Sequence, residues 1–144
     1  MALPQKKFRE MVFQMLYSYD FSQVSEEEIV PFLMQKLAVT KKAARDAWSR
    51  RQKIVDQLPK IDALIAERSE SYRFERIKTV ELTILRLAIY EILVDPAIPP
   101  KVAIAEAIRL ARKFSSPESA SFVNALLDAI YKKHLGDTLD EAAQ

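Results

Sequence analysis

The chain has 144 residues, a formal net charge of +2 and no cysteine. A chain of this length suits one domain and buries a core of its own without covalent crosslinks. The missing cysteines exclude disulfides, thiolate zinc sites and cysteine nucleophiles. The single glycine, Gly136, excludes the glycine-rich loops that bring backbone amides up to phosphates.

Basic residues are unevenly distributed despite the small net charge. Three of them crowd the N-terminus, and a later segment contains six: Lys41, Lys42, Arg45, Arg50, Arg51 and Lys53. Such patches suggest a nucleic-acid footprint of limited size, although solvated helix faces are their commoner cause. The N-terminus lacks the apolar core of a secretion signal, so we expect a cytoplasmic protein that does not enter a membrane.

The first predicted helix begins near Pro4, because proline suits the first helical position. Gln5, Lys6 and Arg9 are predicted to lie off its apolar face, on the first turns. A basic N-terminus opposes the helix dipole, which indicates either a solvated end or an anionic ligand. The apolar face is formed by residues at steps of three and four, namely Phe8, Met11, Val12, Met15, Leu16 and Tyr19.

Two further helices are predicted before residue 60. Ser25 and Glu28 have the spacing of a capping box, and the following proline, Pro31, is expected to limit or restart that helix. Thr40 is a plausible cap for the next helix, which Pro59 is expected to end. The predicted apolar residues of the second helix are Phe32, Leu33 and Leu37, and those of the third are Ala43, Ala44, Ala47, Trp48, Arg51, Ile54, Val55 and Leu58.

The stretch from Thr79 to Leu93 is apolar around most of its circumference, so we predict a buried central helix. A helical pattern over residues 61–72 precedes it, and Asp95-Pro96 and Pro99-Pro100 end it. It is too short and too charged to cross a membrane. Narrow polar strips are expected at Glu81, Thr83, Arg86 and Glu91.

Two more helices are predicted after Pro100. Small residues on the inner face of the first allow close helix packing, and Ser116-Pro117-Glu118 is a typical helix start. Gly136 is expected to close the last helix, which leaves residues 137–144 as an acidic frayed tail. No segment alternates with a period of two, so the predicted fold is all-helical. The inner residues of the two helices are Ala103, Ile104, Ala107, Ile108, Ala111 and Phe114, then Phe122, Val123, Leu126, Leu127, Ile130 and Tyr131.

The sequence offers no support for catalysis. Carboxylates such as Asp20, Asp62 and Asp128 show no pairing, and no serine has a histidine partner. The only histidine, His134, suits the C-terminal end of a helix. We therefore expect no enzyme activity, no metal site and no cofactor.

Several stretches resemble the NusB family, in the same order and over nearly the whole chain. The most specific block runs from Ile84 to Asp128. It contains Ile84-Leu85-Arg86-Leu87-Ala88-Ile89-Tyr90-Glu91, Pro100-Lys101-Val102-Ala103-Ile104-Ala105-Glu106-Ala107 and Phe122-Val123-Asn124-Ala125-Leu126-Leu127-Asp128. Two N-terminal stretches also resemble this family. Its arginine-rich start resembles Lys6-Lys7-Phe8-Arg9-Glu10, and the segment that follows this start resembles Gln14-Met15-Leu16-Tyr17.

The resemblance implies one NusB-like domain over residues 1–136, with about seven helices in two small perpendicular subdomains. The first would cover about residues 1–58 and the second about 59–136. It also implies a transcription antitermination factor that binds the single-stranded boxA element of ribosomal RNA leaders. Its partner would be NusE, a small-subunit ribosomal protein, within the RNA polymerase antitermination complex. Oligomeric state does not follow, and a homodimer is an alternative to a monomer.

Site residues are implied by the same resemblance. Gln5, Lys6, Lys7 and Arg9 match the arginine-rich motif and would neutralise phosphates. Phe122 matches an aromatic residue that contacts a base, and Glu118 stands where the family has an acidic residue near the RNA. Glu81 matches an acid of the central helix that faces NusE. Tyr17 matches a family tyrosine, which we place at the edge of the core.

The chain departs from the family pattern at several positions. Lysine or glutamine replaces arginine in the opening motif, which removes bidentate guanidinium contacts. Phe8 stands where the family usually has a small residue, and Ala105 and Ala125 replace an asparagine and a glycine. One alternative function is a helical protein-binding adaptor of the same fold without sequence-specific RNA recognition. A second is the RNA-binding domain of ribosomal RNA cytosine methyltransferases, although no cofactor-binding segment follows in these 144 residues.

Overall fold

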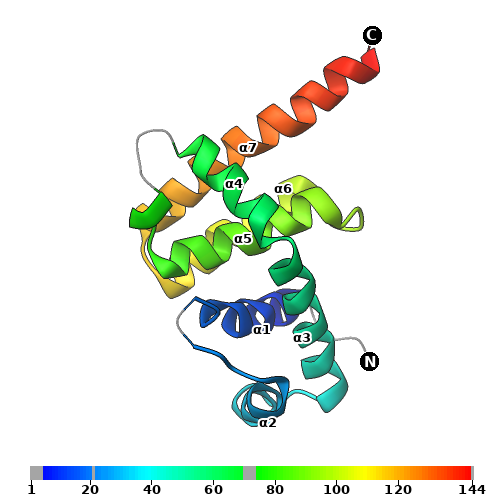
Figure 1. Ribbon diagram of the computed structural model, residues 1–144, viewed down its shortest axis with the longest axis vertical. Coiled ribbons are helices and arrows are strands. Elements are labelled where there is room, and N and C mark those ends of the chain that lie inside the picture. The colour runs from blue at the N-terminus through cyan, green and yellow to red at the C-terminus, as the bar shows by residue number, and fades with distance from the viewer. Residues whose placement is uncertain (1–4, 21, 70–73, 144) are drawn as a thin grey trace. The chain divides into compact units, whose positions relative to one another are not determined.

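The computed structural model describes residues 5–20, 22–69 and 74–143, with side chains described as far as Lys133. Within these ranges all regular structure is helical, which confirms the predicted fold class (Figure 1). None of the described helices is both long and apolar enough to cross a membrane. The elements are α1 (Gln5–Tyr17), α2 (Glu26–Leu37), α3 (Lys41–Asp56), α4 (Leu58–Arg68), a 3-10 turn (Phe74–Arg76), α5 (Thr79–Val94), α6 (Pro100–Phe114) and α7 (Pro117–Ala143).

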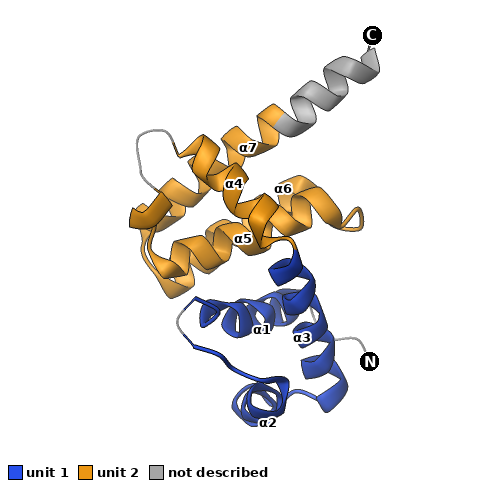
Figure 2. Ribbon diagram, viewed as in Figure 1, with its two compact units in different colours: residues 1–56 blue, residues 57–144 orange. Residues whose placement is uncertain are grey.

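The chain forms two compact units, residues 1–56 with α1 to α3 and residues 57–144 with α4 to α7 (Figure 2). In unit 1, α3 packs against both α1 and α2. In unit 2, α5 packs against α4, α6 and α7. Each unit buries apolar side chains of its own, including Met11, Val12, Leu16, Leu33, Ala47 and Ile54 in unit 1 and Ile65, Ile84, Leu85, Leu110 and Leu127 in unit 2.

The predicted helix caps of unit 1 are confirmed. Ser25 Oγ accepts a hydrogen bond from the Glu28 backbone N–H at 3.3 Å, and Thr40 Oγ1 accepts one from the Ala43 N–H at 3.1 Å. Each bond satisfies an N–H that the first helical turn leaves without a partner. Ala38 caps the C-terminal end of α2: it has a left-handed conformation (φ 54°), and its N–H donates a hydrogen bond to the Met34 carbonyl.

The predictions for Pro31, Phe32 and Tyr19 were wrong. The second helix continues through Pro31 to Leu37, because one lost backbone bond does not outweigh its Ser25 cap and its buried Val30 and Leu33. Phe32 is 56% exposed rather than part of the apolar face. Tyr19 lies beyond the end of α1 and is exposed, so it does not extend that helix's buried face.

The central helix of unit 2 is confirmed. It runs from Thr79 to Val94, and every residue from Glu81 to Glu91 is buried. Its polar residues were expected to form strips between apolar faces, but they are buried as completely as their neighbours. Helix α5 therefore carries buried polar side chains that need partners within the protein.

The ends of the other helices in unit 2 agree only partly with the predictions. Helix α6 begins at Pro100, and Ser116 Oγ caps α7 by accepting a hydrogen bond from the Ser119 N–H at 3.1 Å, both as expected. Pro59 does not end α3 but is the second residue of α4, where proline is tolerated. Gly136 does not close α7, which is helical to Ala143. Pro4 and Tyr72 lie outside the described residues.

Candidate nucleic-acid and partner interface

The first turn of α1 presents a small basic surface. Gln5 and Lys6 are exposed and Lys7 is half-buried, and the first turn of α1 contains no acidic residue. The amide groups at a helix N-terminus add positive potential to that of the lysines, which suits an anionic ligand. Arg9 was expected on the exposed side, but only 5% of it is exposed. The cations of this motif that remain accessible are therefore the exposed Lys6 and the half-buried Lys7.

The first turns of α7 carry the other predicted RNA-binding residues. Glu118 is exposed and Phe122 is half-buried, and the spacing of four residues places both on one face of the helix. Ser115 and Ser119 join the turn before α7 to its first turn through a hydrogen bond of 2.7 Å between their hydroxyl groups. Because Phe122 is only half-buried, part of this residue remains accessible to a ligand.

Glu81 lies in the first turn of α5 and is only 5% exposed. Its carboxylate accepts a hydrogen bond from the Lys78 backbone N–H at 3.3 Å. This bond closes the N-terminal end of α5, so Glu81 stabilises the central helix whatever else it contacts.

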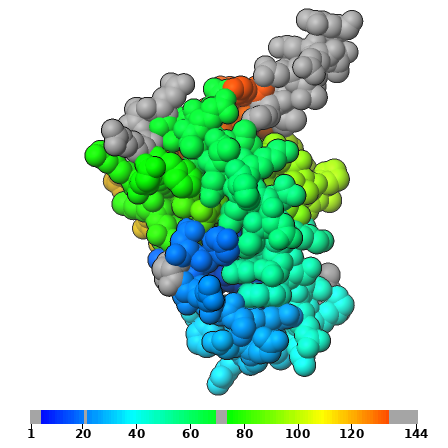
Figure 3. All heavy atoms as spheres, viewed as in Figure 1, coloured from blue at the N-terminus to red at the C-terminus, as the bar shows by residue number. Residues whose placement is uncertain are grey.

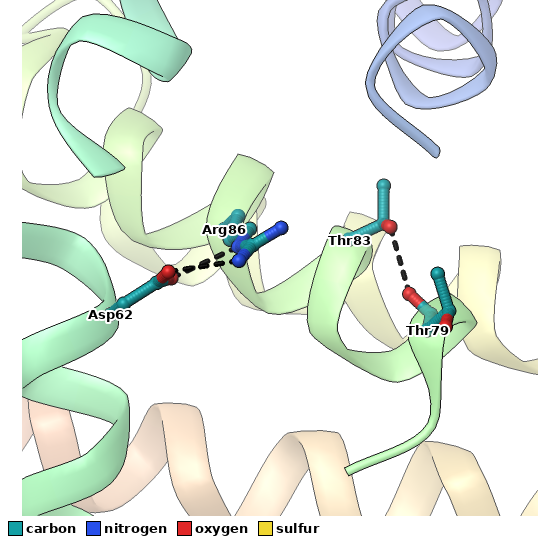
Figure 4. Close-up of polar contacts among 4 residues, drawn as sticks. All are labelled: Asp62, Thr79, Thr83 and Arg86. Carbon is teal, nitrogen blue, oxygen red and sulfur yellow. Dashed lines mark hydrogen bonds and ion pairs between the residues drawn. The ribbon is translucent and has the colours of Figure 1, made fainter. Parts of the chain in front are cut away.

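A partly buried ion pair joins α4 to α5, and the sequence did not predict it. Arg86 Nε and Nη2 donate to the two carboxylate oxygens of Asp62 at 2.9 and 2.8 Å (Figure 4). One turn away, Thr83 Oγ1 donates to the Thr79 carbonyl at 2.7 Å. Two parallel bonds give an arginine–carboxylate pair both energy and fixed geometry. The pair therefore holds the central helix against α4.

A further buried arginine, Arg51, lies in unit 1 against two aromatic rings. The guanidinium carbon of Arg51 is 4.6 Å from the centre of the Trp48 ring and 5.5 Å from that of Tyr19. Burial lowers the pKa of Arg51 below its ordinary value, and Tyr19 partly opposes this effect. The only indication in the sequence was that Arg51 occurs in helical register with the buried Ala44, Ala47 and Ile54.

The sequence model of the NusB family matches residues 6–132. The chain belongs to the NusB family. Two curated relatives are the transcription antitermination proteins NusB of Chlamydia pneumoniae and of Thermotoga sp. (strain RQ2). The first is 36% identical over 89% of this chain and 80% of its own length. The second is 37% identical over 93% of this chain and 94% of its own length. These matches confirm the resemblance that the sequence motifs indicated.

Solved structures of NusB proteins have the same fold. A structure of T. maritima NusB covers 93% of this chain and 94% of its own, with a TM-score of 0.80 and 34% identity. A complex of the antitermination factors NusB and NusE with double-stranded RNA contains a chain that matches with a TM-score of 0.76. That match covers 90% of this chain and 97% of the other, and at 24% identity it supports the fold alone.

Proposed function

We propose that this NusB-family protein is a transcription antitermination factor that binds boxA RNA of ribosomal RNA leaders together with NusE. The observation that carries the proposal is the family match over residues 6–132, together with the fold that the chain shares with T. maritima NusB at 34% identity. The curated relatives are named transcription antitermination proteins, and a NusB of the same fold has been solved with NusE and RNA.

The proposed RNA contacts come from both units. In unit 1, Gln5 and the lysines Lys6 and Lys7 meet phosphates, and the buried Arg9 supports the first turns of α1. In unit 2, a base stacks on the accessible part of the Phe122 ring, with Glu118 one turn away on the same face. Single-stranded RNA is commonly bound in this way: cations pair with the phosphates, and a base stacks on an aromatic ring.

The proposed contact with NusE includes Glu81. Because its carboxylate also accepts the Lys78 N–H, a change at this position affects the start of α5 as well as the partner. Glu81→Gln keeps an oxygen that can accept this bond while it removes the charge. The two roles can therefore be separated by experiment.

In this proposal the protein acts by binding in the cytoplasm, as part of the RNA polymerase antitermination complex, and catalyses no reaction. The alternative is an adaptor that binds protein partners without reading RNA sequence. The lysines in the opening motif are the observation behind this alternative, because they lack the bidentate guanidinium fork. RNA binding distinguishes the two functions directly.

The test is a binding titration with labelled boxA RNA and a scrambled RNA of equal length, each with and without NusE. We expect tighter binding to boxA than to the scrambled RNA, strengthened by NusE. With about two phosphates neutralised, by Lys6 and Lys7, the logarithm of the affinity should fall with the logarithm of salt concentration with a slope of about −1.4. Equal, weak binding of both RNAs under all conditions would reject the proposal in favour of the adaptor.

A further inference from the structure

A row of polar and aromatic side chains, which we call the α3 stripe, runs along one face of α3. Its members Lys41, Arg45, Trp48 and Gln52 are separated by four, three and four residues, which places them on one side of the helix. Trp48 is half-buried and the other three are exposed. In the space-filling view, side chains of α3 (turquoise) lie at the surface (Figure 3).

The charged residues of the α3 stripe are both cations. Arg45 Nε lies 4.0 Å from a carboxylate oxygen of Glu26. Both side chains of this pair are exposed, so the contact contributes little energy. Asp46 instead pairs with Lys42 at 2.8 Å, and both lie on another face of the helix. The α3 stripe therefore keeps a positive potential.

An aromatic surface adjoins these cations. The buried Arg51 lies against the rings of both Trp48 and Tyr19, and its Nη1 donates to Gln52 of the stripe. Its Nε has no hydrogen-bond partner in the described part of the chain. A cation over the face of an aromatic ring attracts the ring. Arg51 therefore holds the Tyr19 ring beside the α3 stripe, close to Trp48. Tyr19 remains 40% exposed and can still receive a ligand on its free surface.

Cations next to accessible aromatic rings are the combination that binds single-stranded nucleic acid without strict sequence preference. We propose that the α3 stripe and Tyr19 form a second RNA-binding surface. A base stacks on the exposed part of Tyr19 or Trp48, and Lys41 and Arg45 meet phosphates. This inference rests on the proposed RNA-binding function and extends it to residues outside the α1 and α7 sites. RNA is favoured over an acidic protein because an acidic surface would pair with the cations but would have no base to stack on the rings.

The chain contains a direct reporter for this site, because Trp48 is its only tryptophan. Full-length protein is titrated with boxA RNA extended by a uridine tract, and tryptophan emission and the anisotropy of labelled RNA are followed together. We expect RNA to quench Trp48 emission with the same midpoint as the anisotropy change. Tyr19→Leu removes one stacking ring and should weaken binding about 5- to 150-fold, the range for loss of one stacked base.

A matched pair of double variants tests the cations. Lys41→Gln/Arg45→Gln removes two charges from the α3 stripe, and Lys42→Gln/Lys53→Gln removes two exposed charges from another face of the same helix. The slope of the logarithm of affinity against the logarithm of salt concentration should become shallower only for the first double variant. The expected change is about 1.4, for two lost phosphate contacts. All four positions are exposed, and a circular dichroism melt verifies the fold of each variant.

Three outcomes would overturn the inference. If the unaltered protein binds boxA RNA while Trp48 emission stays constant and both double variants bind alike, the second surface is rejected and the proposed function stands. If the unaltered protein binds no RNA, both are rejected. If the double variants bind RNA alike but Lys41→Gln/Arg45→Gln alone loses NusE, the α3 stripe is a protein-binding surface.

Discussion

The ion pair between Asp62 and Arg86 should contribute strongly to the stability of unit 2. Removing one partner of a fully buried pair typically costs about 3 to 5 kcal/mol, because the other charge is left in a poorly solvated site. The Arg86 side chain is 5% exposed and that of Asp62 is 27% exposed, and Arg86 has further interactions besides this pair. Water and these interactions offset part of the loss. We therefore expect Asp62→Ala to lower the free energy of unfolding by about 2 to 3 kcal/mol.

The chain offers a matched control for this prediction. Lys42 and Asp46 form an ion pair of the same length, 2.8 Å, but their side chains are 85% and 55% exposed. Exposed pairs four residues apart in a helix contribute only about 0.3 to 0.5 kcal/mol. Both aspartates lie within helices, so replacement by alanine brings a similar gain in helix propensity at each site. Any difference between the two variants in the loss of unfolding free energy therefore reflects how deeply each ion pair is buried.

Urea denaturation followed by circular dichroism measures both variants on the same scale. A cycle with Arg86→Met and the Asp62→Ala/Arg86→Met double variant gives the coupling energy of the pair. The double variant should be more stable than Asp62→Ala alone, because it no longer buries an uncompensated charge. The reasoning fails if Asp62→Ala and Asp46→Ala lower the free energy of unfolding equally.

Three further predictions follow from the described side chains. Charge reversal of Lys6 and Lys7 should weaken boxA binding in a titration with unchanged helical content, whereas reversal of the buried Arg9 should also lower the melting temperature. Glu81→Gln should keep the melting temperature and weaken NusE binding, whereas Glu81→Lys should reduce both; unchanged NusE binding by either variant would contradict the contact. Leu85→Ala should cost about 2 to 5 kcal/mol in urea unfolding, since Leu85 is fully buried; a loss below 1 kcal/mol would contradict close packing around α5.

Local chemistry explains which features were predicted from the sequence alone. The caps at Ser25, Thr40 and Ser116 each depend on residues three positions apart, so the chain specifies them before it folds. The burial of α5 was equally predictable, because a helix with so little polar surface must be covered. The family motifs also belong to the sequence, and the matching relatives confirmed them.

The tertiary structure alone decided how the charged and aromatic residues were distributed. Arg86 is stable at its buried position because Asp62, 24 residues earlier in the chain, supplies both acceptors. Arg51 is buried against Tyr19, a residue of a separate segment, and Arg9 is buried although its neighbour Lys6 is exposed. Periodicity predicts which face of a helix is apolar, but the burial of a charge depends on partners that only packing brings within reach.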